Sequence, residues 1–285
     1  MVTISYELSM VNSLTSETRL IEKISNERYF ISENDLIPAI DISLQSMDRG
    51  ERALIDCDIR HCYGEIGCEE KQIPPINSLN SYRMKIDLEL HQWISPPDIQ
   101  LLSINERLSW GDQKRQMGNF YYRRKDYFNA LQSYQGACRF LDIDLNPLNI
   151  SFDQSDKSIL LDRFIQVQNN IAQVNLLLNN YQACLNAVQH VLKSDPKNVK
   201  ALFRQGKAFF QLGLYDQAIQ PLKSLTQIQR NNSTSSNDNE TYEMISICEQ
   251  KLADYRKNEK ETYQRMFQTK TQNNQQQQTR NNNQV

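Results

Sequence analysis

The chain has 285 residues, of which 39% are hydrophobic, and this is enough for about two domains with buried cores. Its 32 basic and 34 acidic residues give a net charge of -2, so no global field attracts nucleic acid or an anionic membrane. The six cysteines have no C-x-x-C spacing and only three histidines occur, so we expect no disulfide framework, no metal site and no cofactor.

Residues 1–92 are typical of an antiparallel sheet with one short helix. Three stretches alternate apolar and polar residues and are rich in β-branched types: MVTISYELSM, ERALIDCDI and YRMKIDLEL. The helix is expected near DLIPAIDISL. Residues 93–103 then form a linker, because two consecutive prolines interrupt both helix and strand.

From residue 104 to about 267 the apolar residues recur with a period of 3.6, which predicts an all-α second domain. The fold class is therefore α+β, with the sheet domain first. Residues 268–285 are a Gln/Asn-rich tail that cannot bury enough apolar surface to fold, so we expect this tail to be disordered.

The helical region repeats itself. Three landmarks recur at offsets of 34 and then 54 residues: Gly206, Tyr215 and Ala218; Ala172, Tyr181 and Cys184; Gly118, Tyr127 and Ala130. A 34-residue helix-turn-helix period with small residues at the close helix contact resembles the tetratricopeptide (TPR) pattern. The longer offset is one period plus a 20-residue insertion, which FLDIDLNPLNISFDQSDKS supplies as longer helices joined by a loop. We expect three TPR repeats and a C-terminal capping helix over residues 104–267.

The first helices of these repeats carry polar residues at matching positions. If each repeat is numbered from Gly111, Ile165 and Val199, positions 4, 7, 8 and 11 pack and positions 2, 5, 6 and 9 lie on the opposite side. The opposite side holds five donors: Arg115, Asn119, Asn170, Lys200 and Arg204. They resemble the carboxylate clamp with which TPR co-chaperones bind the acidic C-terminal tail of heat-shock protein 90, with arginine in place of the first lysine. The alternative is a solvated helix face.

The first domain resembles the FKBP-type peptidylprolyl isomerases. RHCYGEIGCEEKQIPP followed by MKIDLEL matches their C-terminal half, and LQSMDRGERALI matches the strand and turn before it. The whole chain thus resembles a TPR immunophilin. CYG, GNFYY and KALFRQGKA favour the Bcl-binding type that a C-terminal tail anchors to mitochondria and endoplasmic reticulum. The resemblance implies that the chain begins inside the family's second strand, so that the first strand is missing.

This family lodges a proline in an apolar aromatic pocket. The resemblance carries the remnant of that pocket over to Tyr6, Ile37, Ile40, Tyr63, Ile73 and Ile86. Ile40 replaces the tryptophan of the pocket floor and Ile86 the phenylalanine of the final strand, although both can equally be core residues. Leu20 and Ile21 replace a Phe-Asp pair, and Glu27 replaces another phenylalanine. The lost aromatic area predicts weak or absent isomerase activity.

Two functions remain open from the sequence. The first is a co-chaperone adaptor whose first domain binds a client or a Bcl-family protein, and the second is an active prolyl isomerase that acts on chaperone clients. The family resemblance also suggests calmodulin binding by KLADYRKNEKETYQRMF, which a capping helix explains as well. No window approaches the roughly 18 apolar residues of a membrane span. We therefore expect the chain as written to be cytoplasmic, whereas its anchored relatives lie on mitochondrial and reticulum membranes.

Overall fold

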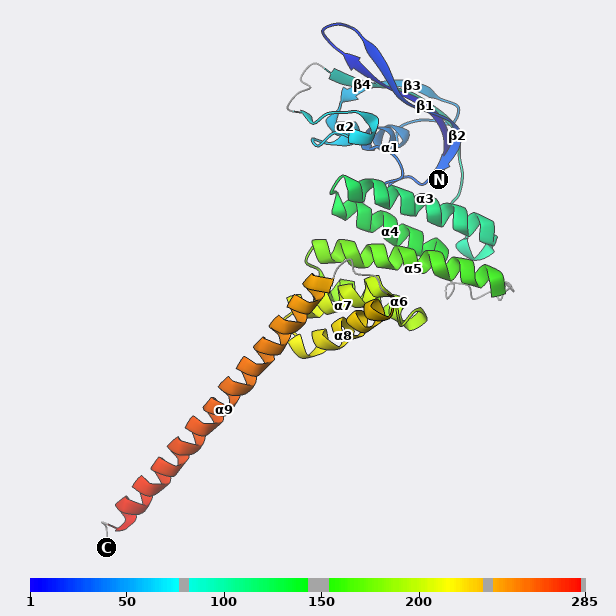
Figure 1. The fold of residues 1–285 in the computed structure, drawn as a ribbon. Coiled ribbons are helices and arrows are strands. Elements are labelled where there is room, and N and C mark those ends of the chain that lie inside the picture. The colour runs from blue at the N-terminus through cyan, green and yellow to red at the C-terminus, as the bar shows by residue number, and fades with distance from the viewer. Residues whose placement is uncertain (77–81, 143–153, 233–237, 283–285) are drawn as a thin grey trace. The chain divides into compact units, whose positions relative to one another are not determined.

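The computed structural model describes residues 1–76, 82–142, 154–232 and 238–282. Its contacts divide the chain into two compact units, Met1–Leu178 and Asn179–Val285. The first unit holds the β-sheet and the helices as far as residue 177, and the second unit holds the helices that follow (Figure 1).

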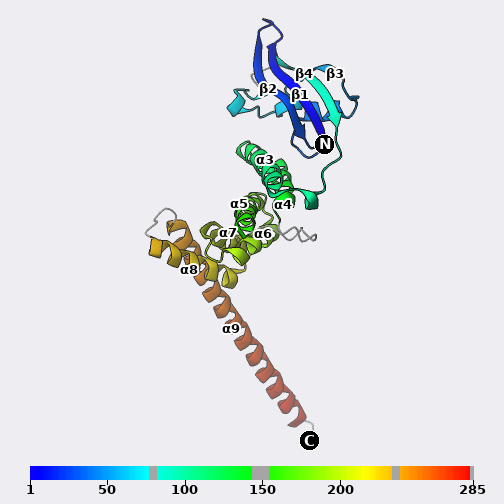
Figure 2. The same ribbon diagram turned by 90° about the vertical axis from the view of Figure 1, so that its right-hand side faces the viewer.

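Among the described residues of the first unit, four strands form one antiparallel sheet: β1 (Val2–Asn12), β2 (Thr18–Tyr29), β3 (Arg52–Asp58) and β4 (Tyr82–Trp93). Figure 2 looks onto this sheet, in which the strand order is β2-β1-β4-β3. The alternating apolar residues of β1 and β4 face the core, as the period of two requires, and Ile4, Leu8 and Ile86 are fully buried. The three predicted strands and the antiparallel arrangement are confirmed.

Strand β2 is one that the alternation pattern did not single out. Its pairing with β1 steps from Leu8↔Glu22 to Ser9↔Leu20, which leaves Ile21 as an extra residue between the two pairs. Such a bulge shifts the side chains that follow it to the other face, so the strand loses a clean period of two. This irregularity explains why the alternation was not visible in the sequence.

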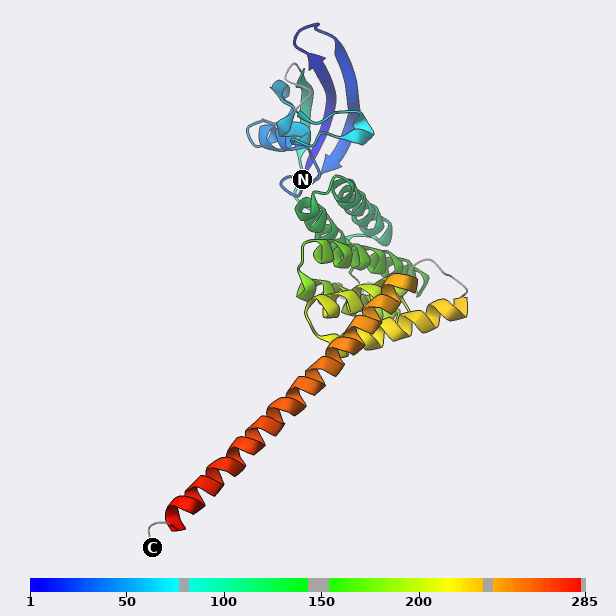
Figure 3. The ribbon, with the colours of Figure 1, turned by 60° about the vertical axis from the view of Figure 1, so that its left-hand side comes forward.

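Two helices lie on the core face of the sheet (Figure 3). Helix α1 (Pro38–Leu44) has a proline at its first position, where the missing N–H has no partner to lose, and it buries Ile40 and Leu44. Helix α2 (Arg60–Tyr63) buries Cys62 and Tyr63. Two short 3₁₀ helices follow at Glu69–Lys71 and Ile99–Leu101, the second of them within the predicted linker.

The helical region of the first unit consists of α3 (Ile104–Arg123), α4 (Tyr127–Leu141) and α5 (Gln154–Leu177). Ser103 starts α3 with a capping box, because its hydroxyl accepts the Glu106 N–H while the Glu106 carboxylate accepts the Ser103 N–H at 2.9 Å. Most of the predicted insertion falls at 143–153, outside the described residues. The second unit consists of α6 (Tyr181–Ser194), α7 (Val199–Gln211), α8 (Tyr215–Asn232) and α9 (Asp238–Asn282).

The repeat landmarks lie where helices pack closely. The tyrosine landmark is the first residue of α4, α6 and α8, and the small residue three positions later is fully buried in each: Ala130, Cys184 and Ala218. A Cβ at Gly118 would stand 2.5 Å from the Tyr134 ring, and one at Gly206 would stand 2.5 Å from Leu222. The close helix pairs of a TPR-like region are therefore confirmed.

A capping helix followed by a disordered tail was expected, whereas the structure has one long helix, α9. Its first turns pack on α8 through Met244 and Ile245, which contact Leu222. The helix then continues as a single rod to Asn282, through most of the tract that was expected to be disordered (Figure 3). A helix already nucleated by packing extends at little cost through residues without glycine or proline. Among the described residues no helix combines the length and the hydropathy that a membrane crossing needs.

Candidate functional site

A cavity of about 320 Å³ opens between the sheet domain and α3. From the sheet domain it is lined by Tyr6, Glu22, Tyr29, Asp35, Leu36, Ile37, Tyr63 and Lys71. From α3 it is lined by Gln113, Gln116, Met117, Phe120 and Tyr121. A cavity with aromatic walls and a few placed polar groups is the usual form of a small ligand site.

Three of the six predicted pocket residues line this cavity and three do not. Tyr6 and Tyr63 are buried in its wall, and Ile37 is half-buried at the start of α1. Ile40, Ile73 and Ile86 lie in the hydrophobic core, each no more than 1% exposed, and do not line the cavity. They pack like ordinary core residues, since a fully buried aliphatic side chain needs no ligand to cover it.

The replaced wall residues of the family pocket also lie away from the cavity. Leu20 is 56% exposed, and Glu27 accepts a hydrogen bond from the Tyr29 hydroxyl at 2.9 Å. Ile21 packs against the core, and it is the next residue, Glu22, that lines the cavity. The carboxylate of the cavity wall thus belongs to Glu22, the residue that follows the bulge.

The Tyr63 hydroxyl is the polar atom of the cavity that most clearly suits a ligand. Tyr63 is 1% exposed, and its hydroxyl has no hydrogen-bond partner among the described residues. Burial, with a smaller contribution from the charge of Glu22, raises the pKa of Tyr63, so the phenol stays neutral and can donate. A buried donor without a partner costs free energy, which a ligand carbonyl would recover.

Two charged side chains of the cavity wall pair with each other. The Lys71 ammonium lies 2.5 Å from the Glu22 carboxylate, and both side chains are about a quarter exposed. The same ammonium lies 5.6 Å from the centre of the Tyr63 ring. Burial, followed by the Glu22 charge, raises the pKa of Tyr6. The cavity therefore offers neutral phenols beside the Glu22–Lys71 ion pair and the Asp35 carboxylate, which pairs with Lys114 behind the wall.

The α3 side of the cavity is held by a buried lysine that sequence reasoning did not identify as functional. Lys114 is 1% exposed, and its ammonium lies 2.7 Å from Glu33 and 2.8 Å from Asp35. It also lies 4.7 Å from the centre of the Phe30 ring. Burial raises the pKa of Asp35, and the Lys114 charge opposes that shift. The sequence does contain a signal for this buried lysine, because Lys114 occupies position 4 of the first repeat, where an apolar packing residue is expected.

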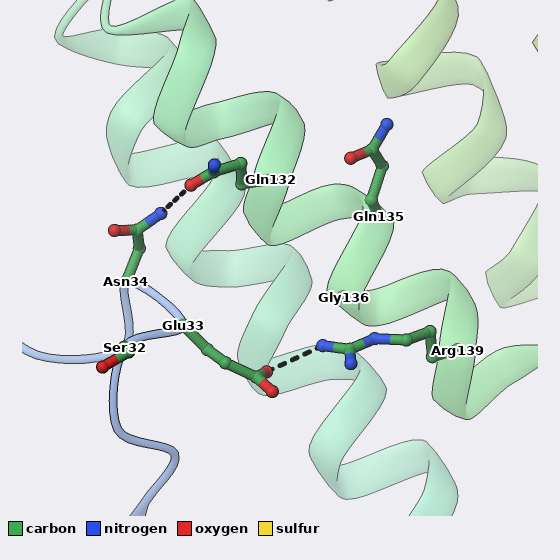
Figure 4. A pocket seen from close by; sticks show the side chains of 7 residues that line it. All are labelled: Ser32, Glu33, Asn34, Gln132, Gln135, Gly136 and Arg139. Carbon is green, nitrogen blue, oxygen red and sulfur yellow. Dashed lines mark hydrogen bonds and ion pairs between the residues drawn. The ribbon is translucent and has the colours of Figure 1, made fainter.

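A second contact joins the loop at 32–34 to α4 (Figure 4). Arg139 pairs with the Glu33 carboxylate at 2.8 Å, and the Asn34 amide donates to Gln132. These residues line an open hollow of about 400 Å³. Next to it Phe30 packs edge-on against Trp110, with ring centres 5.0 Å apart. The first domain is thus anchored to α3 and α4 by both apolar and charged contacts.

Three of the five predicted clamp residues lie in the first unit. Asn119 on α3 accepts a hydrogen bond from the Tyr134 hydroxyl at 2.7 Å and another from the Asn170 amide on α5 at 3.3 Å. Arg115 is paired at 3.0 Å with Asp112, one turn earlier on its own helix. Asp112 was not anticipated, and it offsets part of the positive charge expected at this end.

The other two clamp residues lie on α7 in the second unit. Lys200 is exposed in the first turn of the helix, and Arg204 is half-buried one turn later. The packing residues Ala201 and Leu202 are buried, so α7 presents the two cations on a different side from its core residues.

Comparisons with known proteins give a family match for the first domain. Residues 1–81 match the family described as FKBP-type peptidyl-prolyl cis-trans isomerase. FK506-binding protein 59 of Drosophila melanogaster is 26% identical over 81% of this chain and 48% of its own length. Human peptidyl-prolyl cis-trans isomerase FKBP4 is 23% identical over 82% of this chain and 47% of its own length. The chain therefore spans about half the length of these curated relatives.

Among solved structures, the C-terminal TPR-containing domain of a Plasmodium falciparum FK506-binding protein is similar, at 21% identity and a TM-score of 0.48. The alignment covers 56% of this chain and 99% of that one.

Proposed function

We propose that this chain, which joins an FKBP-type domain to a TPR-like helical region, is an immunophilin that acts as a co-chaperone adaptor. Its helical region binds the acidic C-terminal tail of heat-shock protein 90 through five donors at matching repeat positions. The residues proposed to read the tail are Arg115, Asn119, Asn170, Lys200 and Arg204. Cations and amides at these positions suit a terminal carboxylate, since charge-assisted hydrogen bonds are the stronger ones.

The observation that supports this proposal best is the contact between Asn119 and Asn170. The two amides come from the first helices of consecutive repeats, at positions that only the repeat register relates, and they lie 3.3 Å apart. The Asn119 oxygen accepts both of these hydrogen bonds, so neither of them uses the Asn119 amide nitrogen, which is a donor. Lys200 and Arg204 follow from the same register in the third repeat.

Asp112 changes how much each of the five residues is expected to contribute to the affinity for the peptide. Its carboxylate lies 3.0 Å from Arg115 and 3.7 Å from Arg163, so the charge of Arg115 is already partly balanced. An incoming carboxylate has to compete with Asp112 for this arginine. We therefore expect Lys200 and Arg204 to contribute more to binding than Arg115, and Asp112→Asn to strengthen binding.

Calorimetric titration with a peptide ending in Glu-Glu-Val-Asp tests the proposal. Lys200→Ala or Arg204→Ala removes a charge-assisted hydrogen bond of roughly 1.5–3 kcal/mol, which is about a ten-fold or greater loss of affinity. Amidation of the peptide terminus should weaken binding too, and so should added salt. Lys223→Ala is the matched control, because this exposed lysine lies on α8 and pairs with Glu249. Normal binding by both alanine variants, or by the amidated peptide, would refute the clamp.

A second candidate function is prolyl isomerisation in the cavity, and the unpartnered Tyr63 hydroxyl is the observation that favours it. A neutral phenol that donates to a carbonyl next to proline would help to hold the twisted amide. Against high activity, Ile40 and Ile86 supply no aromatic floor, and α3 forms one wall of the cavity. We therefore expect turnover far below that of a family member with an intact aromatic pocket.

A prolyl isomerisation assay with Leu-Pro and Phe-Pro peptides separates the two functions. We expect weak activity in the wild type and a further loss in Tyr63→Phe, which keeps the ring and removes only the hydroxyl. Wild-type turnover that matches an intact relative would make the enzyme the primary function. Residual activity that Tyr63→Phe leaves unchanged would place the reaction elsewhere.

The finer predictions from family resemblance stay predictions. These are binding of a Bcl-family protein by the first domain, binding of calmodulin by residues 251–267, and attachment of relatives to mitochondrial or reticulum membranes. The stretch 251–265 is largely exposed on α9, so a calmodulin pull-down with and without Ca²⁺ tests the second of them directly.

A further inference from the structure

Two cysteines of the first domain lie next to each other at the point where β3 passes into α2. Cys57 is the last residue but one of β3 and is partly exposed, whereas Cys62 in α2 is 3% exposed. Their Sγ atoms are 3.7 Å apart. The cysteine spacing alone predicted no disulfide framework, and this contact lies outside the function proposed above.

The turn between these cysteines is held by its own hydrogen bonds. The Asp58 carboxylate accepts the Arg60 N–H at 2.9 Å and the Arg60 guanidinium at 3.2 Å. The Cys62 N–H donates to the Ile59 carbonyl at 2.9 Å. Because the backbone is fixed on both sides, the two thiols meet in the folded protein and not merely by chance encounter of a flexible loop.

We propose that Cys57 and Cys62 form a redox-modification site, a dithiol that a peroxide converts into an intrachain disulfide beside Tyr63. A disulfide requires its sulfur atoms at about 2.05 Å, so the pair has to close by roughly 1.6 Å. Rotation of the partly exposed Cys57 side chain can supply most of this movement. The oxidant is therefore a small hydroperoxide that reaches Cys57 from solvent.

The two thiols are suited to different roles. A hydrogen bond with the Cys62 thiol lowers the pKa of Cys57, and the Arg83 guanidinium acts in the same direction against burial and the carboxylates of Asp56 and Asp58. The same hydrogen bond and burial raise the pKa of Cys62. The thiolate is the reactive form of cysteine, so Cys57 attacks and Cys62 resolves.

The reaction balances in two steps. The Cys57 thiolate attacks one oxygen of hydrogen peroxide, the O–O bond breaks, and hydroxide leaves, which oxidises the sulfur to a sulfenic acid. The Cys62 sulfur then attacks the Cys57 sulfur, the S–O bond breaks, and water leaves with the Cys62 proton. In sum two thiols lose two hydrogens and the peroxide is reduced to two molecules of water.

The disulfide would tie α2 to the end of β3. Tyr63 follows Cys62 directly, and its carbonyl accepts a hydrogen bond from Arg124 at the end of α3. Since Tyr63 lines the cavity, oxidation restrains one wall of the proposed ligand site. A rise in peroxide concentration would thus lower the mobility of the cavity wall.

Peptide mapping of the reduced full-length chain after graded hydrogen peroxide tests the proposal. Trypsin cleaves between the two cysteines at Arg60, so the disulfide links peptide 53–60 to peptide 61–71. Free thiols are blocked with iodoacetamide before digestion, and fragment ions locate the bond. We expect Cys57 linked to Cys62 in the wild type and in Cys68→Ser, which removes the other thiol of peptide 61–71. The linkage should be absent from Cys57→Ser and from Cys62→Ser.

The wild-type map decides the matter without depending on the folding of any variant. Linkage of Cys57 to Cys68, oxidation of Cys57 to a sulfinic acid while Cys62 stays reduced, or complete alkylation of both thiols after peroxide would overturn the dithiol. Amide hydrogen exchange is the second readout: residues 59–64 should exchange more slowly in the oxidised wild type than in the reduced one. Unchanged exchange would overturn the link to α2.

Discussion

Lys114→Met is the variant that tests how the first domain is anchored to α3. Methionine keeps the volume of the buried stem and removes the ammonium. Glu33 retains a partner in that variant, because Arg139 also pairs with it. Asp35 loses the cation paired with it, and its buried carboxylate, 2% exposed, keeps only the hydrogen bond from the Phe30 N–H at 3.2 Å among the interactions described for it.

The magnitude follows from this geometry. Removing one partner of a buried ion pair costs about 3–5 kcal/mol, and the surviving Phe30 hydrogen bond places the expected loss near the lower end of that range. Asp35→Asn in the same chain should recover at least about 1.5 kcal/mol, because the buried group is then no longer a charge. Lys85→Met, on the exposed face of β4, is the matched control and should change stability little.

The loss should depend on pH. Burial raises the folded-state pKa of Asp35 above its ordinary 3.8, and removing Lys114 takes away the charge that opposes this shift. A group with a raised folded pKa stabilises the fold fully below its unfolded pKa, and that contribution is lost as the pH rises through the folded value. The deficit of Lys114→Met should therefore be largest near neutral pH and shrink as the pH falls toward 3.8.

Trp110 supplies a local signal for the measurement, because its ring packs against Phe30 at the same contact. Only one other tryptophan occurs, so denaturant titrations in a Trp93→Phe background follow Trp110 alone. A wild-type midpoint for Lys114→Met, no recovery with Asp35→Asn, or a deficit that is constant from about pH 4 to 7 would refute the reasoning.

Two further outcomes are expected. Gly118→Ala should destabilise the chain even though alanine is the better helix former by about 1 kcal/mol, because the new Cβ would stand 2.5 Å from the buried Tyr134 ring. Gly136→Ala, with its nearest contact at 3.4 Å, should be neutral or stabilising, and a Gly118→Ala melting temperature above wild type would contradict the close packing. At about pH 8 iodoacetamide should modify Cys57 well before Cys138, since burial raises the pKa of Cys138 to about 12. A mass-spectrometric time course measures both rates, and equal rates would count against the distinction.

Local periodicity was sufficient to predict most of the fold. The alternation in β1 places Val2, Ile4 and Leu8 on one face, and all three are fully buried. The 34-residue and 54-residue spacings likewise located the small residues of the helix contacts, including Ala218 and Ala130. These predictions succeeded because a helix or a strand determines by its own repeat which residues share a face. The bulge at Ile21 broke that repeat, and the strand that contains it was missed.

The site depended on contacts that no local repeat describes. The sequence placed Lys114 at a packing position, but its partner Glu33 lies 81 residues away in the chain. The sequence also left undecided whether Ile40 and Ile86 line a pocket or fill a core. The periodicity of apolar residues shows which face of an element is buried, but it does not show what covers that face. The same holds for the Cys57 and Cys62 thiols, which only the turn between β3 and α2 brings together. Composition and spacing therefore determined the elements and their buried faces, while tertiary packing decided which faces meet and which polar groups remain without a partner.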